Sequence, residues 1–362
     1  MKPAKPSIER HLAAARLTAI PDDLHTPRHP GVDSETLSGA RKATDLASEV
    51  WLAGDSDSGR LAALEANRAA FDAYAGLGQR LADILTNSYA QLEPSEIEYA
   101  LGEAGLLDAD NPFLSEAERA ALDHDGYVSL GPLLDEPTLR DIRERLDAAA
   151  AEEGNASGSE VSQTVGISRL SGTVLKAMNR DGLFDVFYMQ PRLLAATRHV
   201  LGPRFKMSSS NFHCPLPGFG HQSIHADWGW TVRTPEVVNA IWMLDDFTVD
   251  NGPTRVVPGT HRRGHPFGTA LNAPGRTPYD PVPGETVLTG PAGTCVVYNA
   301  HLWHGGTQNR TAGLRRSLHS YFTRSCRPTQ TRTLEVIDPL VHARLDRARR
   351  AILDVPEWVA ER

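Results

Sequence analysis

Apolar residues recur at two different spacings along the chain, and the change of spacing divides it into a helical part and a β-rich part. Between residues 34 and 90 they stand three or four positions apart, as Leu77, Leu81 and Ile84 do. This is the period of an amphipathic helix, and Ser34 suits an N-cap. The proline-containing residues 1–33 show no sustained period and predict an irregular arm. We therefore expect a helical N-terminal extension over residues 1–115.

The second part of the chain opens with one strand and one helix. Residues 125–134 (DGYVSLGPLL) predict a short strand and a turn, and Asp135 with Pro137 suits the start of a helix. Beyond Leu201 the apolar runs are short and separated by Gly and Pro; they are VVNAIWML, TRVVPG, GTCVVYN and RRSLHSYF. These runs predict an antiparallel β sandwich or barrel with flanking helices over residues 116–330. A helical tail is expected over residues 331–362.

Two segments rich in glycine interrupt the β-rich part. They are residues 154–166 (GNASGSEVSQTVG) and residues 262–293, and the second also contains many prolines. A connection as long as the second usually has a functional role. We expect both to be loops that cover the mouth of a cavity.

The charge balance and the cysteines restrict the possible partners. Lys and Arg number 37 against 45 Asp and Glu, a net charge of −8, so no basic field favours nucleic acid or an anionic membrane. No stretch approaches the ~20 apolar residues of a membrane span. The three cysteines include no CxxC pair, which argues against a disulfide framework or a zinc ribbon and favours a cytoplasmic protein. The oligomeric state is not indicated.

A His-x-Asp pair is the first candidate for chemistry. In a strand, His225 and Asp227 would project to the same face and could hold one metal ion. The alternative is a core histidine beside a surface aspartate. A third ligand could come from His301 or His304, both of which follow the apolar run GTCVVYN. Two histidines and one carboxylate are typical of non-haem Fe(II) oxygenases, whereas zinc more often takes a closed tetrahedral set.

A basic pair near the start of the last apolar run is the second candidate. Arg315 and Ser317 would share one face of a strand, so a guanidinium and a hydroxyl could bind a carboxylate together. Arg316 would point to the other face. The alternative is a dibasic pair that is simply solvated.

The order of these motifs resembles that of the phytanoyl-CoA dioxygenase family. The motifs are His225-Ala-Asp227, the run from Asn251-Gly to Pro-Gly-Thr-His261, and His304-Gly-Gly with Arg315 eleven residues after the histidine. The segment Asp125-Gly-Tyr-Val is also similar to the family's N-terminal strand. The resemblance covers about residues 120–327, and the first 110 residues or so have no counterpart in it.

The resemblance implies a role for each matching residue. His225, Asp227 and His304 would be the iron ligands, and His304 is favoured over His301 because only His304 has the following Gly and the eleven-residue spacing to Arg315. Arg315, helped by Ser317, would bind the distal carboxylate of 2-oxoglutarate. Trp242 would lie against this cosubstrate, and Asn211 is a weaker candidate for its other end. His261 is expected to be a structural or surface group rather than a further ligand, and Arg255 is expected to be a solvated surface charge rather than an anchor for an acidic substrate.

The resemblance also implies the fold and the activity. We expect a mainly β protein with a double-stranded β-helix (jelly-roll, cupin-like) core, flanking helices and the helical N-terminal segment. The expected enzyme uses Fe(II), 2-oxoglutarate and O₂ to oxidise a small molecule, most simply by hydroxylation, with release of succinate and CO₂. Desaturation, cyclisation, epimerisation and demethylation are alternative outcomes, and a non-catalytic ligand-binding module is an alternative of another class. The Ala-, Arg- and Gly-rich composition is typical of high-GC bacteria, in which such enzymes often act in secondary metabolism; this link is an association and not a chemical argument.

Overall fold

The computed structural model describes most of the β-rich part of the chain. The described residues are 96–106, 113–154, 166–227, 235–263, 266, 280–325, 327, 329–331 and 333–355. The helical segment expected over residues 34–90 lies outside them, as do residues 155–165 and most of the 262–279 part of the second glycine-rich segment. Within these ranges, no helix is both long enough and apolar enough to cross a membrane.

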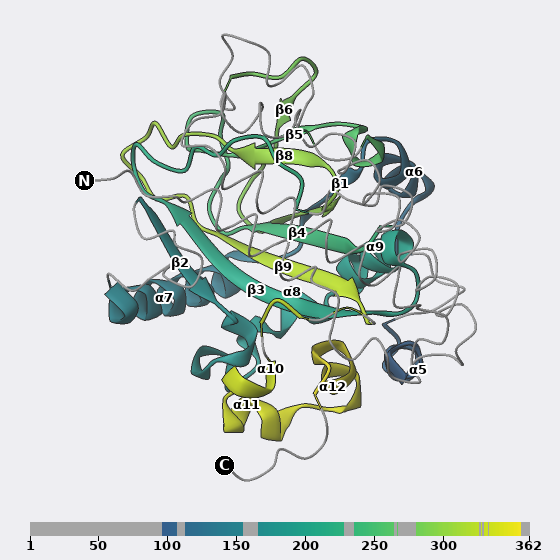
Figure 1. Ribbon diagram of the computed structural model, residues 1–362. Coiled ribbons are helices and arrows are strands. Elements are labelled where there is room, and N and C mark those ends of the chain that lie inside the picture. Colours follow the sequence, from purple (N-terminus) through teal and green to yellow (C-terminus); the bar gives the residue numbers. More distant parts are fainter. Residues whose placement is uncertain are drawn as a thin grey trace, which may run out of the picture.

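A six-stranded sheet with the strand order β1-β7-β4-β9-β3-β2 forms the centre of the molecule, and every pairing in it is antiparallel. Its strands are β1 (Tyr127–Pro132), β2 (Ile167–Ser171), β3 (Phe205–Pro215), β4 (Val237–Met243), β7 (Thr294–Asn299) and β9 (Ser317–Arg324). The long strands β3, β9 and β4 run side by side across Figure 1. Neighbours in this order are mostly distant in sequence, so the sheet joins segments from the whole β-rich part.

A smaller antiparallel sheet, with the order β6-β5-β8, lies above the large sheet in Figure 1. Its strands are β5 (Thr254–Val257), β6 (Thr286–Val287) and β8 (Trp303–Gly306). Apolar side chains of the two sheets meet between them in one buried cluster, which includes Ile241, Met243, Val256 and Tyr298. We call the side of the large sheet that faces the small one its inner face.

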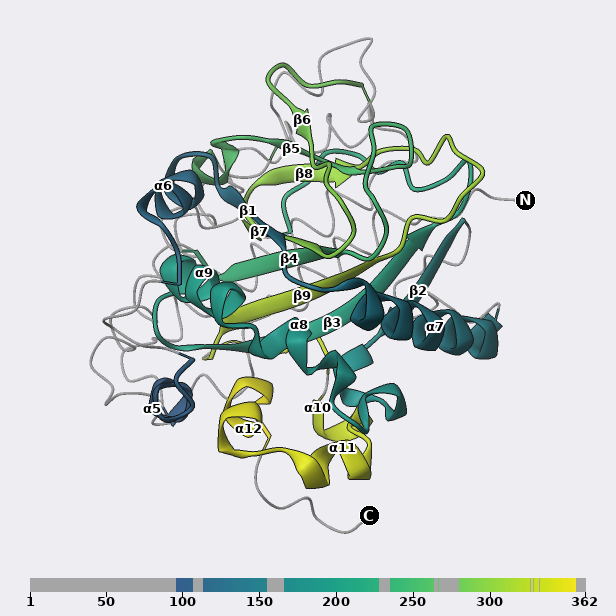
Figure 2. The ribbon, with the colours of Figure 1, turned by 180° about the vertical axis from the view of Figure 1, so that it is seen from behind.

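Helices cover the opposite, outer face of the large sheet, as Figures 1 and 2 show. The helices are α5 (Glu96–Glu103), α6 (Glu116–His124), α7 (Glu136–Glu153), α8 (Val186–Met189), α9 (Pro191–Leu201), α10 (Thr333–Val336), α11 (Pro339–Arg344) and α12 (Arg347–Leu353). Short 3₁₀ turns are η3 (Thr173–Leu175), η4 (Ala177–Asn179), η5 (Leu183–Asp185) and η6 (Thr260–Arg262). The large core cluster lies under this layer, where Val238, Ala240 and Trp242 of β4 pack against helix residues. Strand β4 is therefore buried on both faces.

Helix starts follow from local side-chain chemistry. The Asp135 side chain accepts a hydrogen bond from the Thr138 backbone N–H, and Pro137 stands in the first turn of α7. Ser115 and Glu118 form a capping box at the start of α6. The helix predicted from Asp135 is thus confirmed, as is the short strand before it.

The C-terminal helices are tied to the helical layer over the large sheet through one buried carboxylate. Asp185 accepts hydrogen bonds from Arg344 of α11 at 2.6 and 2.7 Å and from Arg349 of α12 at 2.7 Å. Asn179 and Tyr188 donate to the same carboxylate, at 3.0 and 2.9 Å. These bonds lower the pKa of Asp185 even though burial opposes the shift. Residues 339–349 are therefore fixed to the helical layer over the large sheet.

The expected mainly β architecture with flanking helices is confirmed, and the helical N-terminal segment is not supported. Two local expectations are wrong. Strand β9 begins at Ser317 rather than at Arg315, and the His225–Asp227 segment is not a regular strand. His225 instead forms an isolated antiparallel bridge with His304 of β8.

Candidate metal and cosubstrate site

Two histidines are brought together by backbone pairing. His225 and His304 exchange two N–H···O hydrogen bonds of 2.8 Å, and their rings lie 4.4 Å apart between centroids. The pairing needs the glycines that follow His304. A Cβ on Gly305 would stand 2.8 Å from the Ser223 carbonyl oxygen, and one on Gly306 would collide with the Gly220 carbonyl oxygen. The His-Gly-Gly sequence thus lets β8 lie directly against the segment that carries His225.

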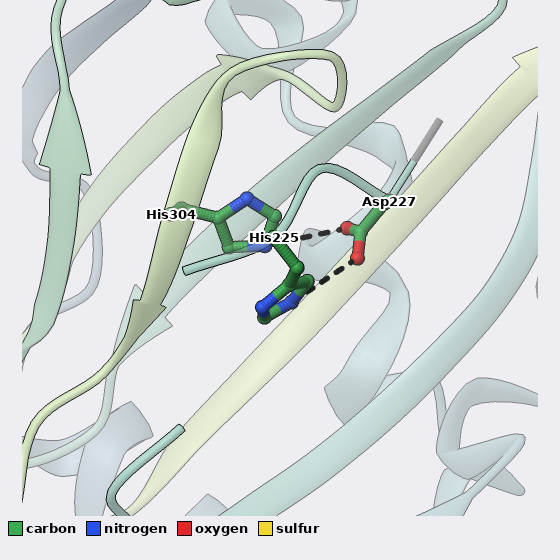
Figure 3. A group of neighbouring side chains, drawn as sticks. All are labelled: His225, Asp227 and His304. Carbon is green, nitrogen blue, oxygen red and sulfur yellow. Dashed lines mark ion pairs between the residues drawn. The ribbon is translucent and has the colours of Figure 1, made fainter. Parts of the chain in front are cut away.

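Asp227 completes a group of three. Its Oδ1 lies 3.7 Å from His225 Nε2 and its Oδ2 lies 3.6 Å from His304 Nε2, as Figure 3 shows. The three side chains offer one ligand atom each within 4.8 Å of one another. Ligands about 2.1 Å from one ion and at right angles would stand about 3 Å apart. A small inward movement would therefore let all three contact one cation.

The chemistry of the donor set fits a divalent metal. His225 Nδ1 lies 2.8 Å from the Ser223 carbonyl oxygen, and His304 Nδ1 lies 2.8 Å from that of Leu302. An Nδ1–H donated to a carbonyl fixes the tautomer and presents Nε2 as the ligand atom. Both histidines are buried, at 8% and 5% exposure, and the Asp227 side chain is 24% exposed. Two neutral imidazoles and one carboxylate with open positions suit Fe(II).

His301, the competing third ligand, lies elsewhere. Its Nε2 accepts a hydrogen bond of 3.4 Å from the Glu236 backbone N–H, and it does not belong to the group of three. Burial, with the nearby charges of His261 and Arg324, lowers the pKa of His301 to about 3. A neutral histidine turned toward the Glu236 backbone is a structural residue.

Arg315 is a buried cation on the inner side of the large sheet. It is 5% exposed, and its Nη1 donates to Ser317 Oγ at 2.9 Å. Its guanidinium lies over the Phe247 ring, 4.6 Å from the centroid. Within the described ranges its Nε has no hydrogen-bond partner and no carboxylate forms an ion pair with it. Burial lowers its pKa to about 10. A dry guanidinium of this kind fits the carboxylate of a bound molecule.

Arg316 has a different environment, as expected for the next residue along the chain, whose side chain points to the other face. It forms ion pairs with Asp245 at 2.9 Å and with Asp147 at 2.7 Å. These pairs raise the pKa of Arg316 although burial opposes them. Arg316 is therefore a neutralised structural cation, and Arg315 is not.

The structure does not bring Trp242 to this site. The side chain points to the outer face of β4, where Nε1 donates to Ser320 Oγ at 3.1 Å. Its ring meets Phe187 of α8 edge to face, with centroids 5.3 Å apart. The alternation of side chains along β4 places Ile241 and Met243, not Trp242, on the inner face.

The central strands are accessible at a few inner-face positions. In β3, β4 and Ser317–Thr323 of β9, every residue is buried except His213, His319 and Tyr321. The two imidazoles stack with centroids 4.4 Å apart and an interplanar angle of 24°. His213 is paired with Ser317, and Asn211 is paired with His319. These partly exposed residues form an aromatic, polar floor between Ser317 and the group of three, and Asn211 borders it.

Several residues at this site were missed from the sequence. Tyr298 lies 3.4 Å from His304 Nε2 through its hydroxyl, and Tyr321 is close enough to Asp227 for that charge to raise its pKa, after burial as the main cause. Arg169 of β2 is 3% exposed and is paired with His213. The alternation of β7 and β9 could have found both tyrosines once the inner face was known. No feature of the sequence pointed to Arg169, because the pairing of β2 with β3 cannot be seen in the sequence.

Other motif residues hold the framework together. His261 packs on Gly126, where φ is +82° and a Cβ would collide with the imidazole. This contact brings the Asp125-Gly and Pro-Gly-Thr-His segments together, and it places His261 outside the group of three. The expectation of a solvated Arg255 is wrong: the residue is 2% exposed and forms an ion pair with Glu285 at 3.3 Å.

Comparison with known proteins assigns the family. Residues 122–317, more than half of the chain, match the phytanoyl-CoA dioxygenase (PhyH) family. The chain therefore belongs to this family, and it is a non-haem iron, 2-oxoglutarate-dependent dioxygenase. The family uses Fe(II), 2-oxoglutarate and O₂.

The individual proteins that match this chain have low sequence identity to it. Dioxygenase af480 of Aspergillus fumigatus is 27% identical over 237 residues, which cover 63% of this chain and 74% of that protein. L-proline trans-4-hydroxylase of Streptomyces griseoviridis is 26% identical over 223 residues, 52% of this chain and 78% of that protein. The solved structure of the carbocyclase SnoK from nogalamycin biosynthesis has a TM-score of 0.43 and 16% identity, over 58% of this chain and 84% of that one.

Proposed function

We propose that His225, Asp227 and His304 hold Fe(II), and that Arg315 with Ser317 binds the distal carboxylate of 2-oxoglutarate. The observation that carries the proposal is the position of Arg315. It is a buried guanidinium whose Nε has no partner within the described part of the chain, and it lies on the inner side of the sheet that also faces the three candidate ligands. A carboxylate there would satisfy a costly buried charge.

Each residue of the proposed site would have a distinct role. The iron, when bound, supplies oxidation of a C–H bond coupled to conversion of 2-oxoglutarate and O₂ to succinate and CO₂. His225 and His304 present neutral Nε2 atoms, fixed by their Nδ1 contacts with backbone carbonyls. Arg315 orients the cosubstrate, and Phe247 under its guanidinium keeps water from that charge. Asn211 is a candidate for the other end of the cosubstrate, and Arg169 offers a second buried cation near the same floor.

The substrate in this proposal is a small molecule, and hydroxylation is the simplest outcome. A dioxygenase and a proline hydroxylase among the relatives support both points. The partly exposed floor of His213, His319 and Tyr321 would face the substrate with polar and aromatic groups. Desaturation, cyclisation, epimerisation or demethylation would need the same iron site and differ only in which substrate carbon lies near it. We also propose that the two sheets close into the double-stranded β-helix of such enzymes.

The proposal is tested by following the cosubstrate alone. The purified protein with Fe(II), O₂ and labelled 2-oxoglutarate should release labelled succinate slowly, even without its substrate. Asp227→Ala should abolish this release. Asp181→Ala removes an exposed carboxylate earlier in the chain and should not affect the release. If the protein binds 2-oxoglutarate but forms no succinate under any condition, it is a ligand-binding module rather than an oxygenase.

A further inference from the structure

A phenol beside the candidate metal site has no role in the activity described so far. Tyr298 of β7 is 1% exposed, and its ring lies 4.9 Å from that of His304 between centroids. Its hydroxyl oxygen is 3.4 Å from His304 Nε2, the atom that faces Asp227. A buried polar group so close to the ligand atoms must fit whatever arrangement they adopt when a metal is bound.

Asn239 fixes this hydroxyl. Its Nδ2 donates to the Tyr298 oxygen at 2.8 Å across the β4–β7 pair, where the two residues are register partners. The Tyr298 oxygen is therefore an acceptor toward Asn239, and its hydrogen is directed to another group. His304 Nε2, 3.4 Å away, is one acceptor toward which it can point.

Metal binding would remove that acceptor. Once Nε2 of His304 is bound to a cation, its lone pair can no longer accept a hydrogen bond. At the same time, Asp227 would give one oxygen to the cation and keep a second oxygen that needs a donor. Its Oδ2 lies 3.6 Å from the same Nε2. The Tyr298 hydroxyl oxygen and Asp227 Oδ2 therefore lie 3.4 and 3.6 Å from the same atom, His304 Nε2.

Resting on the proposed iron site, we propose that Tyr298 is a positioning residue that donates its hydroxyl hydrogen to Asp227 Oδ2 and holds Asp227 as a one-oxygen ligand. Asn239 sets the direction of this hydrogen bond. Tyr321, on the far side of the same inner face and paired with Asn239, completes a polar border around Asp227. A hydrogen bond to the outer oxygen of a metal-binding carboxylate fixes its orientation and leaves the remaining metal positions open.

Calorimetric titration with Mn(II), without cosubstrate, tests this inference. Tyr298→Phe should weaken Mn(II) binding roughly 10-fold, the low end of the effect of losing such a partner. Tyr127→Phe is the matched control and should stay within about twofold of the wild type. Tyr127 is the register partner of Tyr298 on β1, one strand further from Asn239 of β4 than Tyr298 is.

A second variant and a second ligand make the outcome decisive. Asn239→Leu leaves the phenol in place without its support and should weaken Mn(II) binding about threefold, between the wild type and Tyr298→Phe. The dissociation constant of 2-oxoglutarate, measured with saturating Mn(II), should not change in Tyr298→Phe. If Mn(II) affinity is unchanged while that of 2-oxoglutarate falls, the hydroxyl serves the cosubstrate and the inference is wrong. If the wild type and Tyr127→Phe bind no Mn(II), the proposed iron site itself is wrong.

Discussion

At the scale of single residues, the two neighbouring arginines 315 and 316 differ most in what neutralises them. Arg316 is paired with Asp245 and Asp147, whereas Arg315 donates to Ser317, lies over Phe247 and forms no ion pair with a carboxylate within the described part of the chain. The same side-chain chemistry therefore stands in two environments, set by which side of β9 each arginine approaches. A buried cation without a carboxylate is costly to a protein unless a ligand compensates for it.

The apparent KM for 2-oxoglutarate should separate the two arginines. If Arg315 binds the distal carboxylate as proposed, Arg315→Leu removes the partner of that carboxylate, a loss on the order of 3 kcal/mol, which raises KM about 100-fold. Arg316→Leu should leave KM nearly unchanged, although it should lower the free energy of unfolding because it removes one of the two arginine partners of Asp245, Arg143 being the other. Initial rates of succinate release at varied 2-oxoglutarate measure both. Equal effects on KM would contradict the assignment of the carboxylate site to Arg315.

Asp227 leads to a prediction about the product. A carboxylate on the metal occupies a coordination position and adds a negative charge, so it disfavours a halide at the same ion. Turnover in high chloride or bromide should therefore give an oxidised product without halogen. Mass spectrometry of that product is the measurement. A chlorine or bromine isotope pattern in the wild-type product would mean that Asp227 is not a ligand.

At the scale of secondary-structure elements, the site depends on how closely β8 approaches the segment that carries His225. Gly305 and Gly306 have no side chains where the carbonyl oxygens of Ser223 and Gly220 pass. Gln222 adds to this contact, since its side chain accepts a hydrogen bond from the Gly306 N–H at 3.0 Å. The two histidines can face each other only while this approach is kept.

Gly306→Ala tests the close approach. The added methyl group would push residues 220–222 away from β8, and the movement would separate His225 from His304. We expect Mn(II) affinity to fall at least about 10-fold, with a loss of stability of about 1–3 kcal/mol. Gly313→Ala is the matched control, because the nearest atom to its Cβ would be an ordinary 3.9 Å away. Calorimetry and thermal unfolding measure the two effects, and an unchanged metal affinity would count against this role of the glycines.

The sequence predicted the elements well where a short-range pattern decides them. The cap at Asp135, the apolar runs of β4 and β7, and the His-Gly-Gly spacing to Arg315 are all local signals. Which face of a sheet a side chain takes, and which strands pair, depend on residues distant in sequence. These properties were not predicted correctly. Trp242 was expected at the cosubstrate, but the face on which a β4 residue lies depends on which side the helices cover, since both faces are buried. Arg169, Tyr298 and Tyr321 reach the site only through strand register.

At the scale of the whole molecule, the C-terminal helices act as a support for the sheet. Asp185 binds Arg344 and Arg349 and lies beside α8, whose Phe187 packs on Trp242. Ser320 Oγ, which accepts from Trp242, also donates to the Phe187 carbonyl oxygen at 2.5 Å. A continuous set of contacts thus runs from the C-terminal helices through α8 to β4 and β9, behind the candidate site.

Removing the charge of Asp185 should destabilise the entire domain. Asp185→Asn removes the carboxylate partner of Arg344 and one of the two carboxylate partners of Arg349, Asp346 being the other, and it should cost about 3–5 kcal/mol in the free energy of unfolding. Asp181→Asn is the matched control, because Asp181 pairs with Arg145 at the surface, where such a pair contributes at most about 1 kcal/mol. Denaturant unfolding curves of the two variants give the comparison. Similar values would show that the C-terminal helices are not held through Asp185.

The central claim is that this chain binds Fe(II) with His304 and, through that iron and Arg315, binds 2-oxoglutarate. The most direct measurement is an anaerobic titration of the protein and Fe(II) with 2-oxoglutarate, followed by visible absorption. A metal-to-cosubstrate charge-transfer band should appear only when both are present, should persist in His301→Ala, and should be lost in His304→Ala. A wild-type protein that shows no band with saturating Fe(II) and 2-oxoglutarate, or a band that survives His304→Ala and disappears in His301→Ala, would contradict the account.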